Sequence, residues 1–253
     1  MGVLQQHLVH FYEKDDGLLS NVGRYIGEGL QKGDGILVIG TPEHIDSFQR
    51  HLDSLGCKPD SAIRDRRLVF LNAGETLARF MVDGQPDWGL FEKTLRPALW
   101  YVRAHASNMH LRTYGEMAGV LWKTGNVEAA IRLEEFWNKL LKSSFFSLFC
   151  SYPIDVLGDE FRTGGVEALL CAHTRVIPAG LNGDLESAID RAIDDILGTR
   201  APELRESLTG SYRPAWASIP RAESTILWLR NNLPDHAEDI LSRARQYHQA
   251  LAN

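Results

Sequence analysis

Two patterns of apolar residues alternate along the first two thirds of the chain. Short continuous runs such as GILVIGT (residues 35–41) and RLVFLNA (67–73) are typical of strands buried on both faces. Between these runs, apolar residues spaced three and four apart predict helices. The predicted strands cover residues 7–12, 35–41, 67–73, 110–114 and 145–152, and the main predicted helices cover 18–30, 42–56, 87 onward and 127–141. Thr41 and Pro42 are the expected N-cap and first residue of the second of these helices.

Strands that alternate with helices predict an α/β fold with a mostly parallel sheet and helices on both of its faces. Pro97 lies inside the long helix that starts near Asp87, and it predicts a kink or a break there. Beyond residue 184 only helical patterns remain, at 184–198, 201–209, 221–232 and 235–252. We therefore expect an α/β domain over residues 7–178 and an all-helical C-terminal extension over 184–253.

Glu116 follows the predicted strand 110–114 directly. It is therefore expected at the carboxyl edge of the sheet, where open α/β sheets bind their ligands. That expectation depends on where the strand ends. Tyr114, at the end of the same strand, would lie beside it.

Glu134 lies inside the apolar arc of the helix 127–141, and Asn138 follows one turn later on the same arc. A buried carboxylate is costly unless it is paired, so Glu134 needs a partner. An internal arginine such as Arg112 or Arg132 is the simplest candidate, and a bound ligand is the alternative.

The aromatic residues near both glutamates suit a small-molecule pocket, in which apolar walls surround a few polar groups. Aromatic residues near a core are, however, more often part of the packed core itself. The first strand and its turn, HFYEKDDG, add further polar candidates, although a solvated acidic turn is the plainer interpretation. The full set of candidate ligand-binding residues is Glu134, Glu116, Tyr114, Trp122, Trp137, Asn138, Tyr12, His10 and Glu13.

The sequence lacks the motifs that mark several classes of enzyme. A phosphate-binding loop would stand at the first strand-to-helix turn, but the acidic residues of that turn, Glu13, Asp15 and Asp16, would repel a triphosphate. The sequence also lacks the GxSxG, HExxH and GxGxxG patterns. We therefore expect no catalytic residues and no enzyme activity.

The net charge of −6 and the calculated pI of about 5.8 argue against a nucleic-acid partner. No stretch approaches the roughly 20 apolar residues that span a bilayer, and the N-terminus lacks the features of a signal peptide, so a cytoplasmic protein is expected. The three cysteines and nine histidines lack metal-ligand spacing, and His7 and His10 should point to opposite faces of their strand. Neither a disulfide, a metal nor another cofactor is predicted.

Four segments carry a resemblance to a known family. HFYEKDDGLLSNVGRYIGEGLQKGDGILVIGT, LVFLNAGETLARFMVDGQPDW and YGEMAGVLWKTGNVEAAIRLEEFWNKLL followed by FFSLFCSYPID resemble the MEDS family, a sensory domain named for methanogen and methylotroph regulators. The resemblance covers residues 7–175 and implies a RecA-like α/β domain, related to circadian-clock ATPases, that lacks the phosphate-binding loop. It also implies a bacterial regulator that perceives small organic compounds.

Such domains often precede a histidine kinase or a DNA-binding region, and neither signature is present in this sequence. We expect a non-catalytic sensor that binds a small organic ligand at the carboxyl edge of the sheet and signals to a kinase or regulator, with a homodimer as an alternative use of the C-terminal helices. Two rival functions stay open. One is a residual nucleotide-binding protein or hydrolase with Glu116 as general base, and the other is an interaction scaffold whose carboxylates form internal ion pairs.

Overall fold

The computed structural model describes residues 6–180, 183–208 and 218–251. The chain forms two compact units. The first unit comprises Met1–His10 and Lys14–Pro153, and the second comprises Phe11–Glu13 and Ile154–Asn253.

The first unit consists of strands that alternate with helices, in the following order along the chain: β1 (His7–Phe11), α1 (Asp15–Lys32), β2 (Gly35–Gly40), α2 (Pro42–Ser54), α3 (Pro59–Arg64), β3 (Leu68–Asn72), α4 (Ala73–Ala78), β4 (Met81–Val82), β5 (Gln85–Pro86), α5 (Trp88–Ala104), β6 (Leu111–Gly115), α6 (Met117–Lys123), α7 (Val127–Ser143) and β7 (Ser147–Tyr152). Its main sheet has the strand order β3-β2-β6-β7-β1, and β4 and β5 form a separate antiparallel hairpin. Strand β2 pairs in parallel with β3 and β6, and β6 pairs in parallel with β7.

The strand order reverses between β2 and β6. The chain leaves β2 for β3 on one side, whereas it leaves β6 for β7 on the other side. The carboxyl ends of β2 and β6 therefore form the switch point of this open sheet, the position at which such sheets bind ligands.

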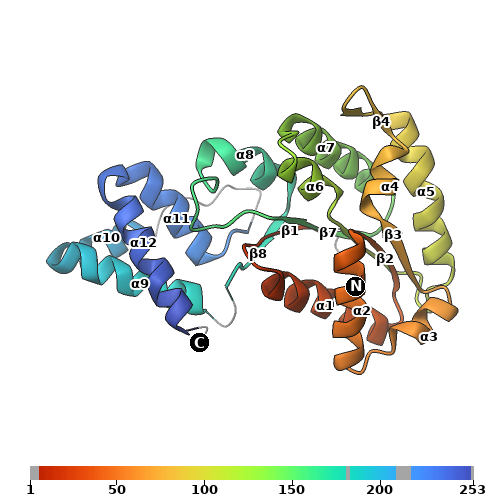
Figure 1. Cartoon of the computed structure of the whole chain (residues 1–253), viewed down its shortest axis with the longest axis horizontal. Coiled ribbons are helices and arrows are strands. Elements are labelled where there is room, and N and C mark those ends of the chain that lie inside the picture. The colour runs from red at the N-terminus through yellow and green to blue at the C-terminus, as the bar shows by residue number, and fades with distance from the viewer. Residues whose placement is uncertain (1–5, 181–182, 209–217, 252–253) are drawn as a thin grey trace. The chain divides into compact units, whose positions relative to one another are not determined.

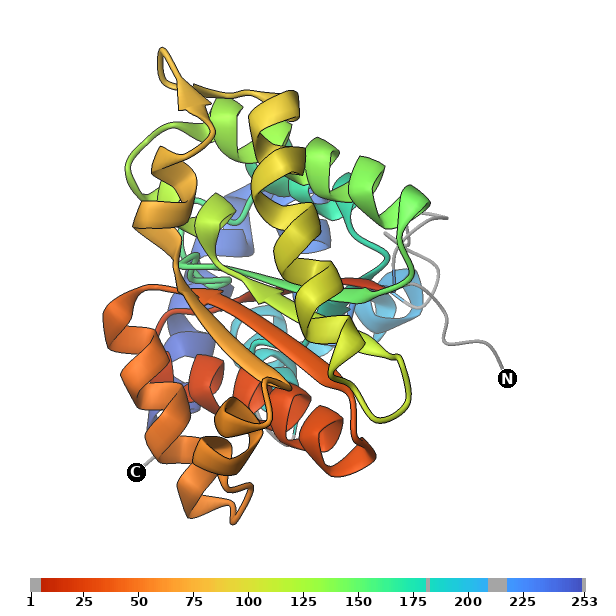
Figure 2. The ribbon, with the colours of Figure 1, turned by 90° about the vertical axis from the view of Figure 1, so that its right-hand side faces the viewer.

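Helices cover both faces of the sheet. Helices α1, α2 and α3 lie on one face and α5 and α7 on the other (Figures 1 and 2). Strand β2 is apolar throughout because both of its faces are covered, and its residues Ile36, Leu37, Val38 and Ile39 are fully buried. Helix α2 begins where the sequence predicts it, with Thr41 as N-cap and Pro42 as first residue.

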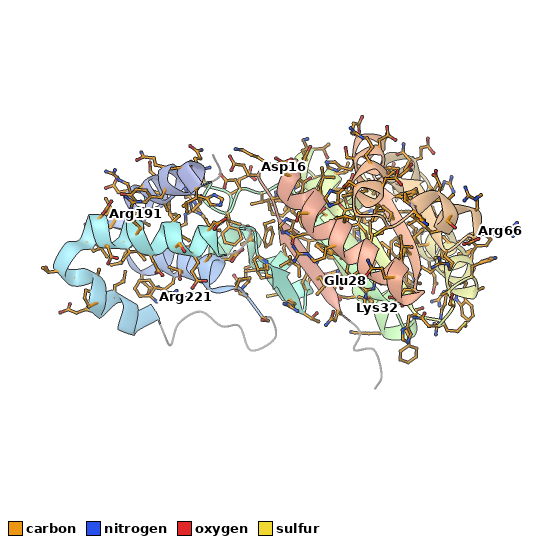
Figure 3. All side chains as sticks on the ribbon, turned by 90° about the horizontal axis from the view of Figure 1, so that it is seen from below. Asp16, Glu28, Lys32, Arg66, Arg191 and Arg221 are labelled. Carbon is orange, nitrogen blue, oxygen red and sulfur yellow. The ribbon has the colours of Figure 1, made fainter. Side chains whose placement is uncertain are left out.

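The second unit is mostly helical. Its elements are α8 (Thr163–Ala172), β8 (Arg175–Ile177), α9 (Asp184–Leu197), the 3₁₀ turn η1 (Gly198–Arg200), α10 (Ala201–Leu208), α11 (Arg221–Asn232) and α12 (Pro234–Leu251). Helices α9 and α12 meet through apolar residues, and the guanidinium of Arg191 lies 3.9 Å from the ring centre of Tyr247. Arg221 of α11, labelled in Figure 3, pairs with Asp190 of α9 at 3.0 Å.

The predicted α/β architecture with a parallel sheet and C-terminal helices is confirmed. Helix α5 runs without a break through Pro97, so a break at that proline is wrong. The short elements α3, α6, β4, β5 and β8 went unpredicted because each has too few residues to show a clear period. Residues 209 and 252, the predicted last residues of two helices, lie outside the described residues.

The two units divide at Pro153, whereas the sequence pattern predicts a domain boundary at 178–184. The division at Pro153 reflects how the folded chain packs, and the predicted boundary reflects a change in the pattern of apolar residues. These are different criteria, so the boundary at 178–184 stays a prediction.

Candidate functional site

Glu116 occupies the switch point between β2 and β6. It follows the last residue of β6 and is the N-cap of α6, with only 3% of its surface exposed. One carboxylate oxygen, Oε1, accepts a hydrogen bond from the backbone N–H of Thr41 at the end of β2. The other, Oε2, accepts one from the Tyr114 hydroxyl at 2.9 Å and lies 2.8 Å from Nδ1 of His44. The sequence placed Glu116 and Tyr114 correctly at this edge.

Tyr114 links Glu116 to the next strand of the sheet. Its ring is fully buried, and its hydroxyl lies 2.7 Å from Oγ of Ser151 on β7. Tyr114 has one proton to donate, and the Glu116 carboxylate only accepts. Ser151 therefore donates to Tyr114, which donates to Glu116.

His44 connects Glu116 to the first helix. Its Nε2 lies 3.4 Å from the carboxylate of Asp15, an exposed residue in the first turn of α1. The hydrogen bond to Glu116 raises the pKa of His44 above 6.5, burial opposes this rise, and the charges of Glu116 and Asp15 add to it. Four strand ends thus contribute to one edge: Asp15 follows β1, His44 follows β2, Glu116 follows β6 and Ser151 lies near the end of β7.

Glu134 is the centre of a second polar cluster. It lies on α7 with none of its surface exposed. Its Oε1 accepts a hydrogen bond from the Tyr152 hydroxyl at 2.5 Å. Its Oε2 lies 3.1 Å from Nε2 of His7 and 3.6 Å from Sγ of Cys150, and these two atoms are themselves 3.4 Å apart.

Asn138 supports this cluster from one helical turn away. Its side-chain carbonyl Oδ1 lies 3.0 Å from Nδ1 of His7, so the His7 ring donates from Nδ1. Burial raises the pKa of both Cys150 and Tyr152 well above their ordinary values, and the nearby charge of Glu134 raises them further.

The internal-arginine explanation for buried Glu134 is wrong, because His7 is the basic residue that pairs with it. Arg112 instead forms an ion pair with Asp34 at 2.8 Å. The Arg132 guanidinium lies over the Phe136 ring at 5.9 Å.

The two clusters lie on opposite faces of the sheet. Cys150 and Ser151 are neighbours on β7, so their side chains point to opposite faces. Ser151 contacts Tyr114, whose ring packs against Phe48 of α2, whereas Cys150 contacts Glu134 of α7. The structure therefore does not bring Glu116 and Glu134 into one pocket.

The two tryptophans lie on the Glu134 side. Trp137 is 1% exposed and packs edge-on against Phe91 at 5.2 Å, as a core residue does. Trp122 is half-buried, and its ring lies 5.8 Å from that of Tyr152. Tyr152 connects Trp122 to the Glu134 cluster.

The three candidates from the first strand and its turn are separated. His10 is buried on the α1 face, with Nε2 lying 3.4 Å from Nδ2 of Asn21, so His7 and His10 do point to opposite faces. Tyr12 and Glu13 belong to the second unit, where Glu13 is exposed and lies 3.5 Å from Arg245 of α12.

The sequence did not predict His44 and Ser151 as members of the Glu116 cluster, nor His7 and Cys150 as members of the Glu134 cluster. One signal pointed to His44. Thr41-Pro42 marks the start of a helix just after β2, and this places His44 in the first turn at the carboxyl edge.

Two surface hollows lie away from both clusters. A hollow of about 590 Å³ is lined by residues of α5, including Lys93, Arg96 and Trp100. A second, of about 250 Å³, lies between the end of α1 and α3 and includes Cys57 and Arg67. Neither hollow includes Glu116 or Glu134.

Among the described residues, no helix has both the length and the apolar character needed to cross a membrane. Neither a curated protein nor a solved structure matches the chain. A family model does match: residues 6–174 fit the model described as MEDS, the MEthanogen/methylotroph, DcmR Sensory domain. That match covers well over half of the chain and agrees with the segments that resemble the family. The chain therefore belongs to the MEDS family of sensory domains.

Proposed function

We propose that this sensory domain binds a small organic ligand at the switch point of its sheet, with Glu116 as the anchor for the polar end of the ligand. One observation carries the proposal. The carboxylate of Glu116 lies between the ends of β2 and β6, where open α/β sheets bind ligands. The family match supports the sensing role.

The ligand would reach Glu116 by displacing His44. The His44 side chain is 15% exposed, whereas Glu116 and Tyr114 lie beneath it. A ligand that replaces the His44 N–H must donate a hydrogen bond to a carboxylate, so amines and alcohols fit better than anions. Phe48 and Tyr114, whose rings lie 5.2 Å apart, would supply the apolar wall.

A binding role fits the hydrogen bonds of Glu116 better than a catalytic one. Its oxygens already accept hydrogen bonds from Thr41, Tyr114 and His44. A general base needs a lone pair within reach of the proton that it removes. The rival function is hydrolysis with Glu116 as base, and phosphate release from a nucleotide that disappears in Glu116→Gln would favour it.

We further propose that ligand occupancy is relayed to a separate signalling or transcriptional protein. A ligand shifts a conformational equilibrium only if it binds one state more tightly than the other. Displacement of His44 from Glu116 would distinguish the two states. The helices α9, α11 and α12 are the proposed relay, and slower or faster amide exchange in them on ligand addition would test it.

Thermal unfolding in the presence of small compounds tests the binding proposal. The panel consists of alkylamines, alcohols, carboxylic acids and nucleotides, applied to the unmodified chain, to Glu116→Gln and to Glu128→Gln. Glu128 is an exposed residue in the first turn of α7 and serves as the matched control. A ligand at 100 times its dissociation constant adds about 2.7 kcal/mol to the free energy of unfolding.

We expect one class of donor compounds to stabilise the unmodified chain and Glu128→Gln but not Glu116→Gln. Equal stabilisation of all three would place the binding site elsewhere. No stabilisation by any compound would favour the scaffold function, in which both carboxylates serve only internal contacts.

A further inference from the structure

The Glu134 cluster plays no part in the proposed sensor site, and its three central side chains have the chemistry of metal ligands. His7, Glu134 and Cys150 supply an imidazole nitrogen, a carboxylate oxygen and a sulfur. Their exposed fractions are 2%, 0% and 1%. All three belong to the first unit and come from β1, α7 and β7.

The separations of the three donor atoms match one coordination sphere. The distances are 3.1 Å between His7 Nε2 and Glu134 Oε2, 3.4 Å between His7 Nε2 and Cys150 Sγ, and 3.6 Å between Cys150 Sγ and Glu134 Oε2. In a tetrahedral zinc site, bonds of about 2.0 to 2.3 Å place neighbouring donors about 3.3 to 3.7 Å apart. Small side-chain shifts would therefore be enough to admit an ion.

Two further residues fix the orientation that a metal needs. The Nδ1–H of His7 donates to Oδ1 of Asn138, and this hydrogen bond holds Nε2 toward Glu134 and Cys150. The Tyr152 hydroxyl donates to Oε1 of Glu134 and leaves Oε2 as the ligand atom. Metal-bound histidines and carboxylates usually have such supporting hydrogen bonds.

We propose that His7 Nε2, Glu134 Oε2 and Cys150 Sγ bind one divalent transition-metal ion of the zinc type, at a site separate from Glu116. A nitrogen, oxygen and sulfur donor set favours Zn²⁺ or Co²⁺ over the oxygen-seeking Mg²⁺ and Ca²⁺. Binding displaces the thiol proton of Cys150 and the proton that Nε2 of His7 carries in the metal-free state, and both protons are released to water. A four-coordinate ion needs one further donor, from water or another side chain.

The competing state holds no metal. In it, Nε2 of His7 donates to the Glu134 carboxylate, and the Cys150 thiol donates a weak hydrogen bond to the same oxygen. The buried polar groups have partners in both states, so a measurement of the metal content of the protein distinguishes the two states.

The test uses the full chain, produced in cells grown with Zn²⁺ and separately with Co²⁺ so that the ion is present during folding. Metal per chain is measured by mass spectrometry. The cobalt form is examined for a thiolate-to-metal charge-transfer band. Variants Cys150→Ser and His7→Gln remove proposed ligands, whereas Cys57→Ser and Cys171→Ser remove the other two thiols, which are less buried.

We expect one ion per chain, retained in Cys57→Ser and Cys171→Ser and lost in Cys150→Ser and His7→Gln. The charge-transfer band should be absent from Cys150→Ser even if that variant keeps some cobalt. Metal content far below one ion per chain in the unmodified protein, or full retention with the band in Cys150→Ser, would overturn the proposal. Glu116→Gln should keep its metal, so failure of the sensor-site proposal would leave this result unchanged.

Discussion

Glu116 and Glu134 lie on opposite faces of one sheet. Glu116 accepts hydrogen bonds at the ends of β2 and β6, whereas Glu134 contacts residues of β1 and β7. Ser151 and Cys150, adjacent on β7, mark the two faces, since Ser151 belongs to the Glu116 cluster and Cys150 to the Glu134 cluster. The sheet thus separates two buried carboxylates that the sequence suggested as one pocket. Their energetic effects should therefore be independent.

The first prediction is that the effects of Glu116→Gln and Glu134→Gln on stability add. Sites without shared partners add to within about 0.5 kcal/mol. The comparison pair is Glu116→Gln with Tyr114→Phe, whose side chains touch at 2.9 Å and should show a coupling of about 1 kcal/mol. Urea unfolding of the single and double variants measures the coupling free energy of each pair. A coupling between the glutamates as large as that of the comparison pair would contradict the separation of the clusters.

Local patterns in the sequence were enough to place each glutamate. Glu116 could be placed at the carboxyl edge because the predicted strand 110–114 ends just before it, and the helical period was enough to predict that Glu134 is buried. Both predictions depend only on residues within one element. The same reasoning predicts that Asn138 shares the face of Glu134, and both residues do contact His7.

The partners of each glutamate depend on the tertiary fold, which periodicity does not predict. His7 precedes Glu134 by more than a hundred residues, and the two meet only because β1 lies beside β7 in the sheet. The face on which a helix packs depends on the strand order as well. With the order β2-β6-β7 known, the crossover through α7 would have separated Glu134 from Tyr114 and Glu116.

The second prediction concerns His44 and pH. Because folding raises the pKa of His44, the folded state binds more protons than the unfolded state above pH 6.5. This contribution to stability is fully present below pH 6.5 and is lost as the pH rises through the pKa of the folded state. Urea unfolding of the unmodified chain and His44→Gln over a pH series should show a smaller pH dependence in the variant. Glu116→Gln should reduce the dependence similarly, because the main cause of the raised pKa is removed.

A third prediction follows for the ligand. If a donor ligand competes with His44 for Glu116, its affinity should rise with pH, because the neutral imidazole is the weaker competitor. Titration calorimetry over a pH series, with the most stabilising amine or alcohol from the thermal screen, measures this affinity. His44→Gln should bind that compound with little change over the same pH range. Affinity that falls with pH in the unmodified chain would count against displacement of His44.

The fourth prediction concerns Glu223 in the second unit. Its Oε1 accepts a hydrogen bond from the N–H of Ala179 at 2.7 Å, and its Oε2 is buried without a partner among the described residues. Burial raises its pKa above 4.5, so the stability that it contributes is present at acid pH and is lost as the pH rises through the folded pKa. Relative to the unmodified chain, Glu223→Gln should gain stability between pH 4.5 and 8, measured as thermal unfolding. A difference in stability between the two proteins that stays constant across this pH range would show that folding does not raise the pKa of Glu223.

The last prediction tests how closely α6, the helix capped by Glu116, packs on β7. A Cβ on Gly119 would lie 2.3 Å from the backbone carbonyl oxygen of Ser151, and a backbone atom of a central strand moves little. We expect Gly119→Ala to cost about 2 kcal/mol of unfolding free energy, as overpacking in a dense core does. The matched control is Gly164→Ala on α8, where an added Cβ meets no atom within 4 Å and should stabilise by a few tenths of a kcal/mol up to about 1 kcal/mol. Because Ser151 also bonds Tyr114, the Gly119 variant should weaken ligand stabilisation as well. A Gly119 variant as stable as the control would mean that α6 can move away from β7, and the Glu116 site would then be less rigid than these contacts indicate.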